Sequence, residues 1–228
     1  MKYWGMALRV ALAFGTFGPF CTTALADDQA NLLKLLADPT VQQNFINSAA
    51  RSAVLVNNPC PSAQFSVTDK IAIYEPLVFD GSGLLVTGAF KRAVNEQGCG
   101  TSRILNVLLW VQGAKSIATG ALLPGTTRAD PVLQKDAAGY AFNTANILAS
   151  SAVENCQAPY LADTEFIEQE SVVLEGAKGP SWRELWTLVW CTKKMQIPMR
   201  FIPDRTGTSI TVGPNTAIKV LPLDAKTK

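Results

Sequence analysis

The stretch SWRELWTLVWC, residues 181–191, is the most informative part of the chain, because it contains three of its five tryptophans. Trp182, Trp186 and Trp190 recur every four residues, a spacing that places side chains on one side of a helix but also on one face of a β-strand. The segment that follows contains Pro198, which a helix interior does not accommodate and an edge strand or a bulge does. A segment that closes a hairpin onto such a strand is itself a strand. The three tryptophans are therefore predicted to share one face of a strand.

The same stretch has a counterpart earlier in the chain. WRELWTLVWC at Trp182–Cys191 aligns with FKRAVNEQGC at Phe90–Cys99, an offset of 92 residues. DPVLQK at Asp130–Lys135 aligns with DPTVQQ at Asp38–Gln43, again with an offset of 92. Separate landmarks that share one offset indicate an internal duplication. The two halves are predicted to cover about residues 38–110 and 130–202.

Each half is predicted to begin with a helix. In both halves an aspartate precedes a proline, and this pair marks a helix start because the carboxylate accepts the free amides while the proline ring needs no amide partner. The predicted helices cover residues 39–54 and 131–150, and a short extra helix covers 29–38. The second helix has apolar residues at three- and four-residue steps, which predict one buried face: Leu133, Ala137, Tyr140, Ala141, Thr144, Ile147 and Leu148.

The rest of each half is predicted to be strands. Segments rich in β-branched and aromatic residues alternate with Gly-containing turns. The resulting fold class is α+β, with an α-β-β-β unit used twice. Two antiparallel sheets, or one shared six-stranded sheet, pack on the two main helices. The tail after residue 203 adds a turn and a last short strand. The connection LLPGTTRAD, residues 122–130, is short, so residues 27–228 are predicted to form one pseudo-symmetric domain.

The first 26 residues have the pattern of a signal peptide. Lys2 and Arg9 are the charges that precede an apolar run at Val10–Phe20, and Ala24-Leu25-Ala26 is a small-x-small cleavage site. The run is too short to span a bilayer, and no later segment is an 18-residue apolar run. Cleavage after Ala26 would deliver the protein to the periplasm, with secretion beyond it as the other destination.

The mature chain has balanced charge and an even number of cysteines. Without Lys2 and Arg9, 18 of the 20 basic residues remain against 18 acidic ones, so no basic excess indicates nucleic acid as a partner. Four cysteines remain, which in an exported protein indicates two disulfides. All three connectivities fit a two-fold axis. We predict Cys60–Cys99 and Cys156–Cys191, because each bond then ties a helix exit to the hairpin of the same half.

The chain also resembles a family of small exported proteins of Gram-negative bacteria. The resemblance rests on D-P-x-Φ-Q at Asp38–Gln42, P-G-T-T-x-A-D-P at Pro124–Pro131, W-x-E-x-W-T at Trp182–Thr187 and P-x-x-F-x-P-D-x-x-G-T at Pro198–Thr208. It covers most of the mature chain. Because the family is uncharacterised, the resemblance implies an exported location and a fold, and implies no chemistry.

The chain has no histidine, which removes several chemistries at once. Ser-His-Asp and Cys-His nucleophile systems need histidine, and so do histidine-ligated zinc and haem. No G-x-G-x-x-G or Walker sequence occurs. We therefore predict no cofactor and no metal, name no catalytic residue, and favour a protein that is not an enzyme.

The carboxylates and the tryptophans are the remaining candidates. Asp163, Glu165, Glu168, Glu170 and Glu175 precede the Trp strand. One interpretation is that two of them form a glycosidase-type acid/base pair, and the simpler one is a solvated strand edge. Glu184 shares the predicted strand face of the tryptophans, and Arg183 lies on the opposite face. Trp182, Glu184, Trp186 and Arg183 are the predicted binding residues. The alternative is that the tryptophans are core.

The leading interpretation is a non-enzymatic periplasmic binding or accessory protein whose ligand is an apolar molecule, a glycan or a protein partner. A carboxylate-dependent hydrolase of glycosidase type and a structural component of the envelope are the alternatives. The aromatic enrichment is specific to the second half, where Trp182 and Trp186 replace Phe90 and Val94. Trp182 is expected at the rim of a site with Glu184 at its floor, and Trp186 is expected to be buried at the strand centre.

Overall fold

The structure, a computed structural model, describes residues 21–55, 60–113, 116–149, 159–171, 173, 175–177 and 179–223. Within these ranges, helices pack on antiparallel sheets, and the predicted α+β class is confirmed. The alternative of one shared sheet is wrong, because the strands form two separate sheets. None of the helices in the described ranges has the length and apolar character needed to cross a bilayer.

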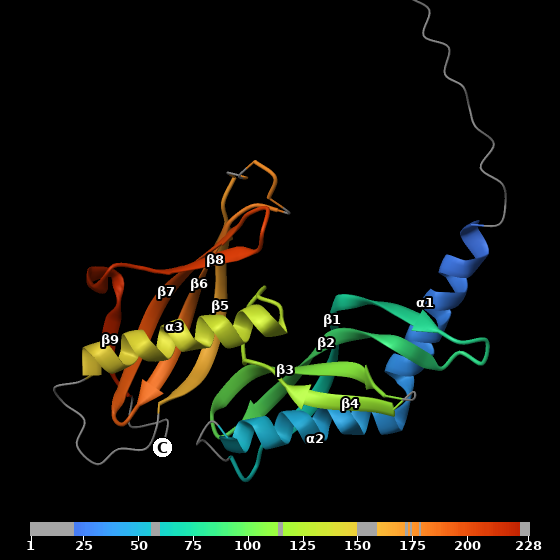
Figure 1. Ribbon diagram of the computed structural model, residues 1–228. Helices are drawn as coiled ribbons and strands as arrows, with labels where there is room; N and C mark the ends of the chain where they lie inside the picture. The colour runs from blue at the N-terminus through green and yellow to red at the C-terminus, as the bar shows by residue number, and fades with distance from the viewer. Residues whose placement is uncertain are drawn as a thin grey trace, which may run out of the picture.

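The first half contains two helices and a four-stranded sheet. Its strands are antiparallel in the order β1-β2-β3-β4, and α2 covers one face of this first sheet (Figure 1). The elements are α1 (Cys21–Ala37), α2 (Pro39–Leu55), β1 (Gln64–Phe79), β2 (Leu85–Gly98), β3 (Thr101–Gln112) and β4 (Ser116–Ala121).

The second half has one long helix and a five-stranded sheet. Its order is β5-β6-β7-β8, and β9 also pairs with β7. Helix α3 covers one face of this second sheet (Figure 1). The elements are α3 (Pro131–Ala149), β5 (Tyr160–Gln169), β6 (Trp182–Trp190), β7 (Lys193–Pro203), β8 (Thr208–Val212), a 3₁₀ turn at Asn215–Ala217 and β9 (Lys219–Pro222).

The predicted helix starts are confirmed at atomic detail. Asp38 Oδ1 accepts hydrogen bonds from the amides of Thr40 and Val41, and Asp130 Oδ1 accepts the same pair two and three residues later. These bonds satisfy amides that have no partner inside the helix. The helix predicted at 29–38 is longer than expected and begins at Cys21, because no Gly or Pro lies between Cys21 and Asp38.

Each sheet has its own hydrophobic core. Helix α2 packs Phe45 and Ala49 onto the first sheet, and α3 packs a stripe of small residues onto the second. That stripe, Ala137, Ala141 and Ala145, is fully buried, which lets the helix lie close to the bulky tryptophan strand. The predicted helix face was partly wrong.

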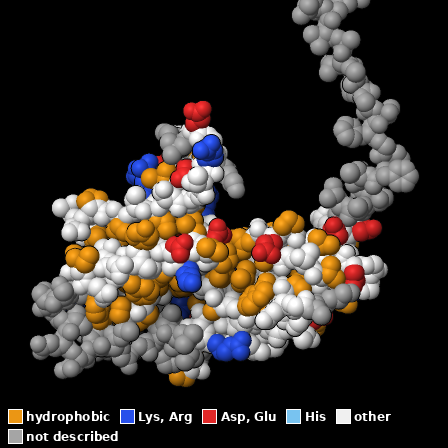
Figure 2. All heavy atoms as spheres, viewed as in Figure 1, with side chains coloured by type: hydrophobic (Ala, Val, Ile, Leu, Met, Phe, Trp, Pro, Cys, Tyr) orange, Lys and Arg blue, Asp and Glu red, His pale blue; other side chains and the backbone are white. Residues whose placement is uncertain are grey.

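Tyr140 and Ile147, which were predicted to be buried, are 51% and 72% exposed. They sit beside the alanine stripe rather than on it, because the stripe follows a strict four-residue step. Val132 of the same helix is exposed as well. Figure 2 shows hydrophobic side chains on the face of the molecule that bears α3.

The tryptophan segment is a strand, as predicted. Strand β6 pairs with β7 so that Trp182 lies opposite Phe201 and Leu185 lies opposite Pro198. Pro198 was expected at an edge or a bulge, yet β7 is an inner strand. It is accommodated because β8 pairs with β7 only from Met199 onward and β9 only as far as Gln196. The proline therefore lies in the gap between them, where no amide donor is needed.

The tail gives the predicted last strand as β8, but β4 and β9 were not foreseen. Both are short, with six and four residues. Strands of this length contain too few residues to show a clear sequence pattern, and their pairing depends on the neighbouring strand.

The connection between the halves, residues 122–130, is partly buried and is hydrogen-bonded to both halves. Asn106 of β3 donates to the carbonyls of Leu123 and Gly125, and Thr164 of β5 donates to the carbonyl of Pro124. Gly125 has a φ of +96°, and a Cβ there would lie 2.0 Å from the Thr164 carbonyl oxygen. Glycine is therefore required, and residues 122–130 bind both sheets through hydrogen bonds.

A disulfide joins Cys60 to Cys99 across a separation of 39 residues, which confirms the predicted pair of the first half. Cys99 lies in the turn between β2 and β3, so the bond ties the chain after α2 to this hairpin. Cys191 occupies the corresponding turn between β6 and β7 and is also disulfide-bonded. Cys156 lies outside the described residues, so the pair Cys156–Cys191 stays a prediction.

Candidate functional site

Glu184 organises the predicted tryptophan face. Its carboxylate is 1% exposed and accepts three hydrogen bonds of 2.8 Å, from Trp182 Nε1, Trp186 Nε1 and the backbone amide of Arg128. A buried carboxylate is stable only when its oxygens are paired in this way. The cluster therefore ties the connection between the halves to the second sheet.

The two predicted tryptophans differ in exposure. Trp186 is 0% exposed and belongs to the core under α3. Trp182 is half-buried, and its ring stacks on Phe201 with centroids 4.9 Å apart. This places Trp186 at the strand centre and Trp182 toward the strand end, in the expected order. The structure brings Trp182, Glu184 and Trp186 into one cluster whose visible role is to hold the fold.

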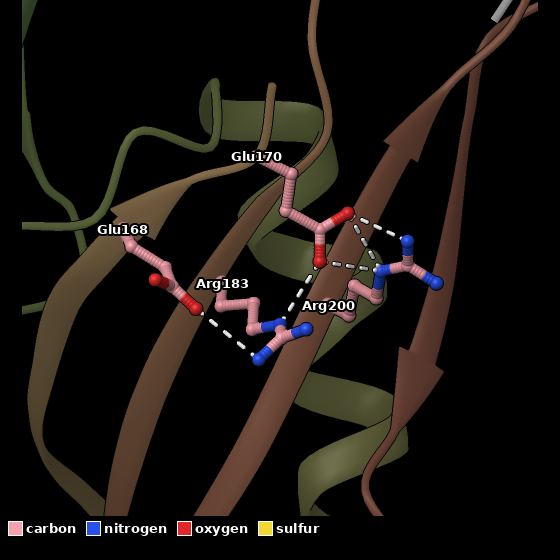
Figure 3. Close-up of polar contacts among 4 residues, drawn as sticks. All are labelled: Glu168, Glu170, Arg183 and Arg200. Atoms are coloured by element: carbon pink, nitrogen blue, oxygen red, sulfur yellow. Dashed lines mark hydrogen bonds and ion pairs between the residues drawn. The ribbon is translucent and has the colours of Figure 1, made fainter. Parts of the chain in front are cut away.

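Arg183 is separated from this cluster, because successive side chains of a strand point to opposite faces. On the helix-free face of the second sheet, Arg183 Nε lies 2.9 Å from Glu170 Oε1 and Nη1 lies 3.1 Å from Glu168. Figure 3 shows the Glu170 carboxylate between Arg183 and Arg200. The residues predicted as one binding site are thus divided between two faces of β6.

Arg183 and Arg200 lie directly opposite each other in the β6–β7 ladder, an arrangement that is unfavourable for like charges. Glu170 compensates both. Its Oε2 lies 2.6 Å from Arg200 Nη2, and its side chain is only 13% exposed. The hydrogen bond from Arg200 is the main reason why the pKa of Glu170 is lowered, and the same bond raises the pKa of Arg200.

An apolar groove of about 460 Å³ occupies this helix-free face of the second sheet. Leu185 and Pro198, a cross-strand pair, are on its floor. Arg183 and Arg200 follow them along the same two strands and also line the groove. The other apolar lining residues come from β5, from β7, from β8 and from the turn after it: Ile167, Met199, Val212, Pro214 and Ala217. The groove therefore has a mainly apolar lining, to which Arg183, Arg200, Glu168 and Glu184 add charged residues.

Local sequence explains how this groove stays open. Pro198 lies where β7 has no partner on the side of β8 and β9, and Gly213 donates its amide to the Pro198 carbonyl at 2.8 Å. A Cβ on Gly213 would approach Pro198 Cβ to 3.2 Å, so a small residue lets β8 turn away at this point. The 3₁₀ turn at Asn215–Ala217 then forms one wall, and Ile167, which is 49% exposed, is on the β5 side.

A second groove, of about 560 Å³, lies where the first sheet meets the start of α3. Tyr74, Trp110 and Asp130 are among its lining residues. The Tyr74 hydroxyl is buried and has no hydrogen-bond partner among the described residues. Burial, followed by the charges of Asp130 and Glu184, raises the pKa of Tyr74 to about 12. No sequence pattern predicts this groove.

Lys91 of β2 contacts the segment that connects the two halves. Its Nζ donates to the Thr127 carbonyl at 3.0 Å. Burial lowers the pKa of Lys91, and the nearby charge of Glu184 opposes this effect. The lysine is therefore part of the contact between the first sheet and the connecting segment.

Two of the carboxylates considered for a hydrolase, Glu168 and Glu170, are engaged in ion pairs with arginine. Glu168 and Glu170 are both bound to Arg183, and a lowered pKa makes Glu170 unsuited to donate a proton as a general acid. Burial raises the pKa of Asp163, but its Oδ1 accepts the Thr164 amide at the connecting segment. Among the described residues, no cluster of three or more Cys, Asp or Glu side chains is arranged to hold a metal ion.

No protein-family model, characterised protein or solved structure matches this chain. Function is therefore inferred from the grooves and their charges.

Proposed function

We propose that this protein is an exported, non-enzymatic binding protein that holds an apolar ligand in the groove on the helix-free face of the second sheet. The observation that carries the proposal is the groove itself, with Leu185 and Pro198 on its floor and Arg183 and Arg200 on its wall. Binding sites for small molecules are typically concave, mostly apolar and provided with a few well-placed polar groups. This groove has all three properties.

The volume of the groove supports a small ligand. Ligand sites are commonly about 300–1,000 Å³, and this groove measures about 460 Å³. The charged groups beside it are already neutralised by Glu170 and Glu168. They are therefore suited to orient a ligand and not to transfer protons.

The proposal of export rests on the N-terminal sequence and on the redox chemistry of the chain. Residues 1–26 have the charge, apolar run and cleavage pattern of a signal peptide. The Cys60–Cys99 disulfide fits an oxidising compartment such as the periplasm. N-terminal sequencing of exported protein should begin at Asp27. A chain that begins at Met1 would contradict cleavage.

The proposal that the halves repeat one unit is supported by their pairing. Phe90 lies opposite Leu109 in the first half, and Trp182 lies opposite Phe201 in the second, so both partners are displaced by 92 residues. The turns between these strands place Cys99 and Cys191 at positive φ, 49° and 57°. A duplicated unit would produce the same hairpin register twice.

The buried charges of the two halves also correspond. Arg92 occupies the position 92 residues before Glu184, and both are buried. Arg92 Nη1 donates to the Leu36 carbonyl, whereas Glu184 accepts the amide of Arg128, which is 92 residues after Leu36. In both halves the second strand of the hairpin unit, β2 or β6, thus contacts the chain shortly before the main helix. The side chain on the strand is the donor in the first half and the acceptor in the second. Together with the hydrogen-bonded connection, this supports one pseudo-symmetric domain.

Groove occupancy can be tested with the uncharged, environment-sensitive dye Nile red. Ala217 is exposed and lines the groove, so Ala217→Trp should fill part of it. Asn143→Trp on the exposed side of α3 is the matched control. We expect saturable fluorescence enhancement with the wild type and the control, and its loss in Ala217→Trp. Equal enhancement in all three proteins would overturn the proposed site.

A further inference from the structure

The charged residues that line the groove are Arg183, Arg200, Glu168 and Glu184, and of these Glu184 is buried and bound to Trp182 and Trp186. The two arginines are the cationic residues of the lining, whereas Glu170, the carboxylate that they share, is not among the lining residues. The arginine side chains are 55% and 46% exposed. The groove therefore combines an apolar body with cationic groups that are accessible from solvent.

The contacts of Glu170 show which anion this pair accepts. Arg200 Nε lies 2.9 and 3.1 Å from the two carboxylate oxygens of Glu170, and Nη2 lies 2.6 Å from Oε2. Arg183 Nε adds a bond of 2.9 Å to Oε1. A planar guanidinium matches a planar carboxylate through two nearly parallel hydrogen bonds. Glu170 thus occupies the position that a ligand carboxylate would take.

We propose that the ligand of this groove is a carboxylate-headed amphiphile, such as a fatty acid. Its apolar chain lies over Leu185 and Pro198, and its carboxylate binds Arg200 and Arg183 in place of Glu170. This inference rests on the function proposed above and names the chemical class of the ligand. Glu170 acts as an internal competitor that keeps two opposed arginines neutralised while the groove is empty.

Replacement of Glu170 on the arginines leaves its carboxylate ionised and able to turn toward solvent. Glu170 comes at the end of β5, directly after Gln169, and its backbone stays fixed by the hydrogen bond from its amide to the Ser181 carbonyl. The exchange therefore needs a rotation of one side chain and no change in the sheet. Glu168 does not replace it, because its contact is a single bond of 3.1 Å to Arg183.

The test uses isothermal titration calorimetry of the purified protein with octanoate, 1-octanol and octylammonium, which share one chain and differ in head-group charge. Octanoate should bind most tightly. Arg200→Gln should weaken octanoate about tenfold, which corresponds to the loss of one charge-assisted hydrogen-bonded pair. Glu170→Gln should strengthen octanoate, because the competing charge is gone. Arg51→Gln, an exposed arginine on α2, is the matched control and should change nothing.

The head-group series separates this inference from the proposed function. One outcome is that octanol and octanoate bind equally, that Arg200→Gln and Glu170→Gln change neither affinity, and that Ala217→Trp blocks both. This outcome supports the apolar site and overturns the inference that the ligand has a carboxylate. A preference for octylammonium overturns it as well. If octanoate, octanol and octylammonium all fail to bind, both the proposed apolar site and the carboxylate inference are contradicted. Circular dichroism of each variant establishes that a loss of binding is not a loss of fold.

Discussion

Arg183 and Arg200 lie directly opposite each other on neighbouring strands, and both bind the carboxylate of Glu170. Two like charges at such positions repel each other, and the carboxylate that compensates them comes from Glu170, the residue directly after β5. The same two arginines also line the apolar groove. A structural ion pair and a candidate ligand site therefore share their residues.

The first prediction concerns the pH dependence of this arrangement. The pKa of Glu170 is lowered from 4.5, mainly by the Arg200 hydrogen bond. A carboxyl with a lowered native pKa contributes stability that is present above its unfolded pKa and is lost as the pH falls through its native pKa. The wild type should therefore be more stable than Glu170→Gln above about pH 5, and the difference should disappear in stronger acid.

Urea unfolding of both proteins from neutral to acid pH measures this difference directly. A stability difference that persists unchanged at the most acidic pH, or that increases there, would contradict the assigned contacts of Glu170.

The second prediction concerns Glu184. Glu184→Ala removes the acceptor for Trp182 Nε1, Trp186 Nε1 and the Arg128 amide. A buried donor without a partner costs roughly 1–3 kcal/mol, so the variant should lose about 3–5 kcal/mol of unfolding free energy. Glu168→Ala is the matched control, because its side chain is 53% exposed and its ion pair contributes about 1 kcal/mol or less. Similar losses in the two variants would show that Glu184 is not the organising residue.

The third prediction compares two tryptophans of one strand face. Trp186 is fully buried, so Trp186→Ala should cost about 3–5 kcal/mol of unfolding free energy. Trp182 is half-buried, and Trp182→Ala should cost clearly less. Equilibrium denaturation of both variants gives the order. A larger loss from Trp182→Ala would mean that the strand register is wrong.

The fourth prediction concerns the disulfides. The Cys60–Cys99 bond closes a loop with a separation of 39 residues, and a loop of this size contributes about 4 kcal/mol in the chain-entropy model. The double variant Cys60→Ser with Cys99→Ser should lose about that amount in a denaturant titration. Non-reduced peptide mapping should yield Cys60–Cys99 and Cys156–Cys191, and a cross-half pair would reject the scheme.

The elements that could be predicted from the sequence are those with local signals. Asp38 and Asp130 each precede a proline, and this pair fixes a helix start through interactions within three residues. Pro198 excluded a helix and so identified β6 and β7 as strands. Short strands such as β4 were missed because their pairing is decided by the neighbouring strand and not by their own residues.

The candidate site was predicted only in part. Arg183 was named, but its grouping with Trp182, Glu184 and Trp186 depended on proximity in sequence, and strand alternation separates it from them. Arg200 was missed, although a hairpin turn at Cys191 and Thr192 places it opposite Arg183. Glu170 was considered for acid/base chemistry. Its actual partners are set by β5–β6 pairing, which has bulges that no local pattern reveals.

The most direct test of the central claim, that the groove on the second sheet holds an apolar ligand, is native mass spectrometry of the protein purified under conditions that preserve bound molecules. The wild type and Asn143→Trp should carry an additional mass that organic extraction releases as a carboxylate-headed amphiphile. Ala217→Trp should lack it. A wild-type protein that shows only the mass of its own chain, or an additional mass that Ala217→Trp retains in full, would contradict the proposed groove.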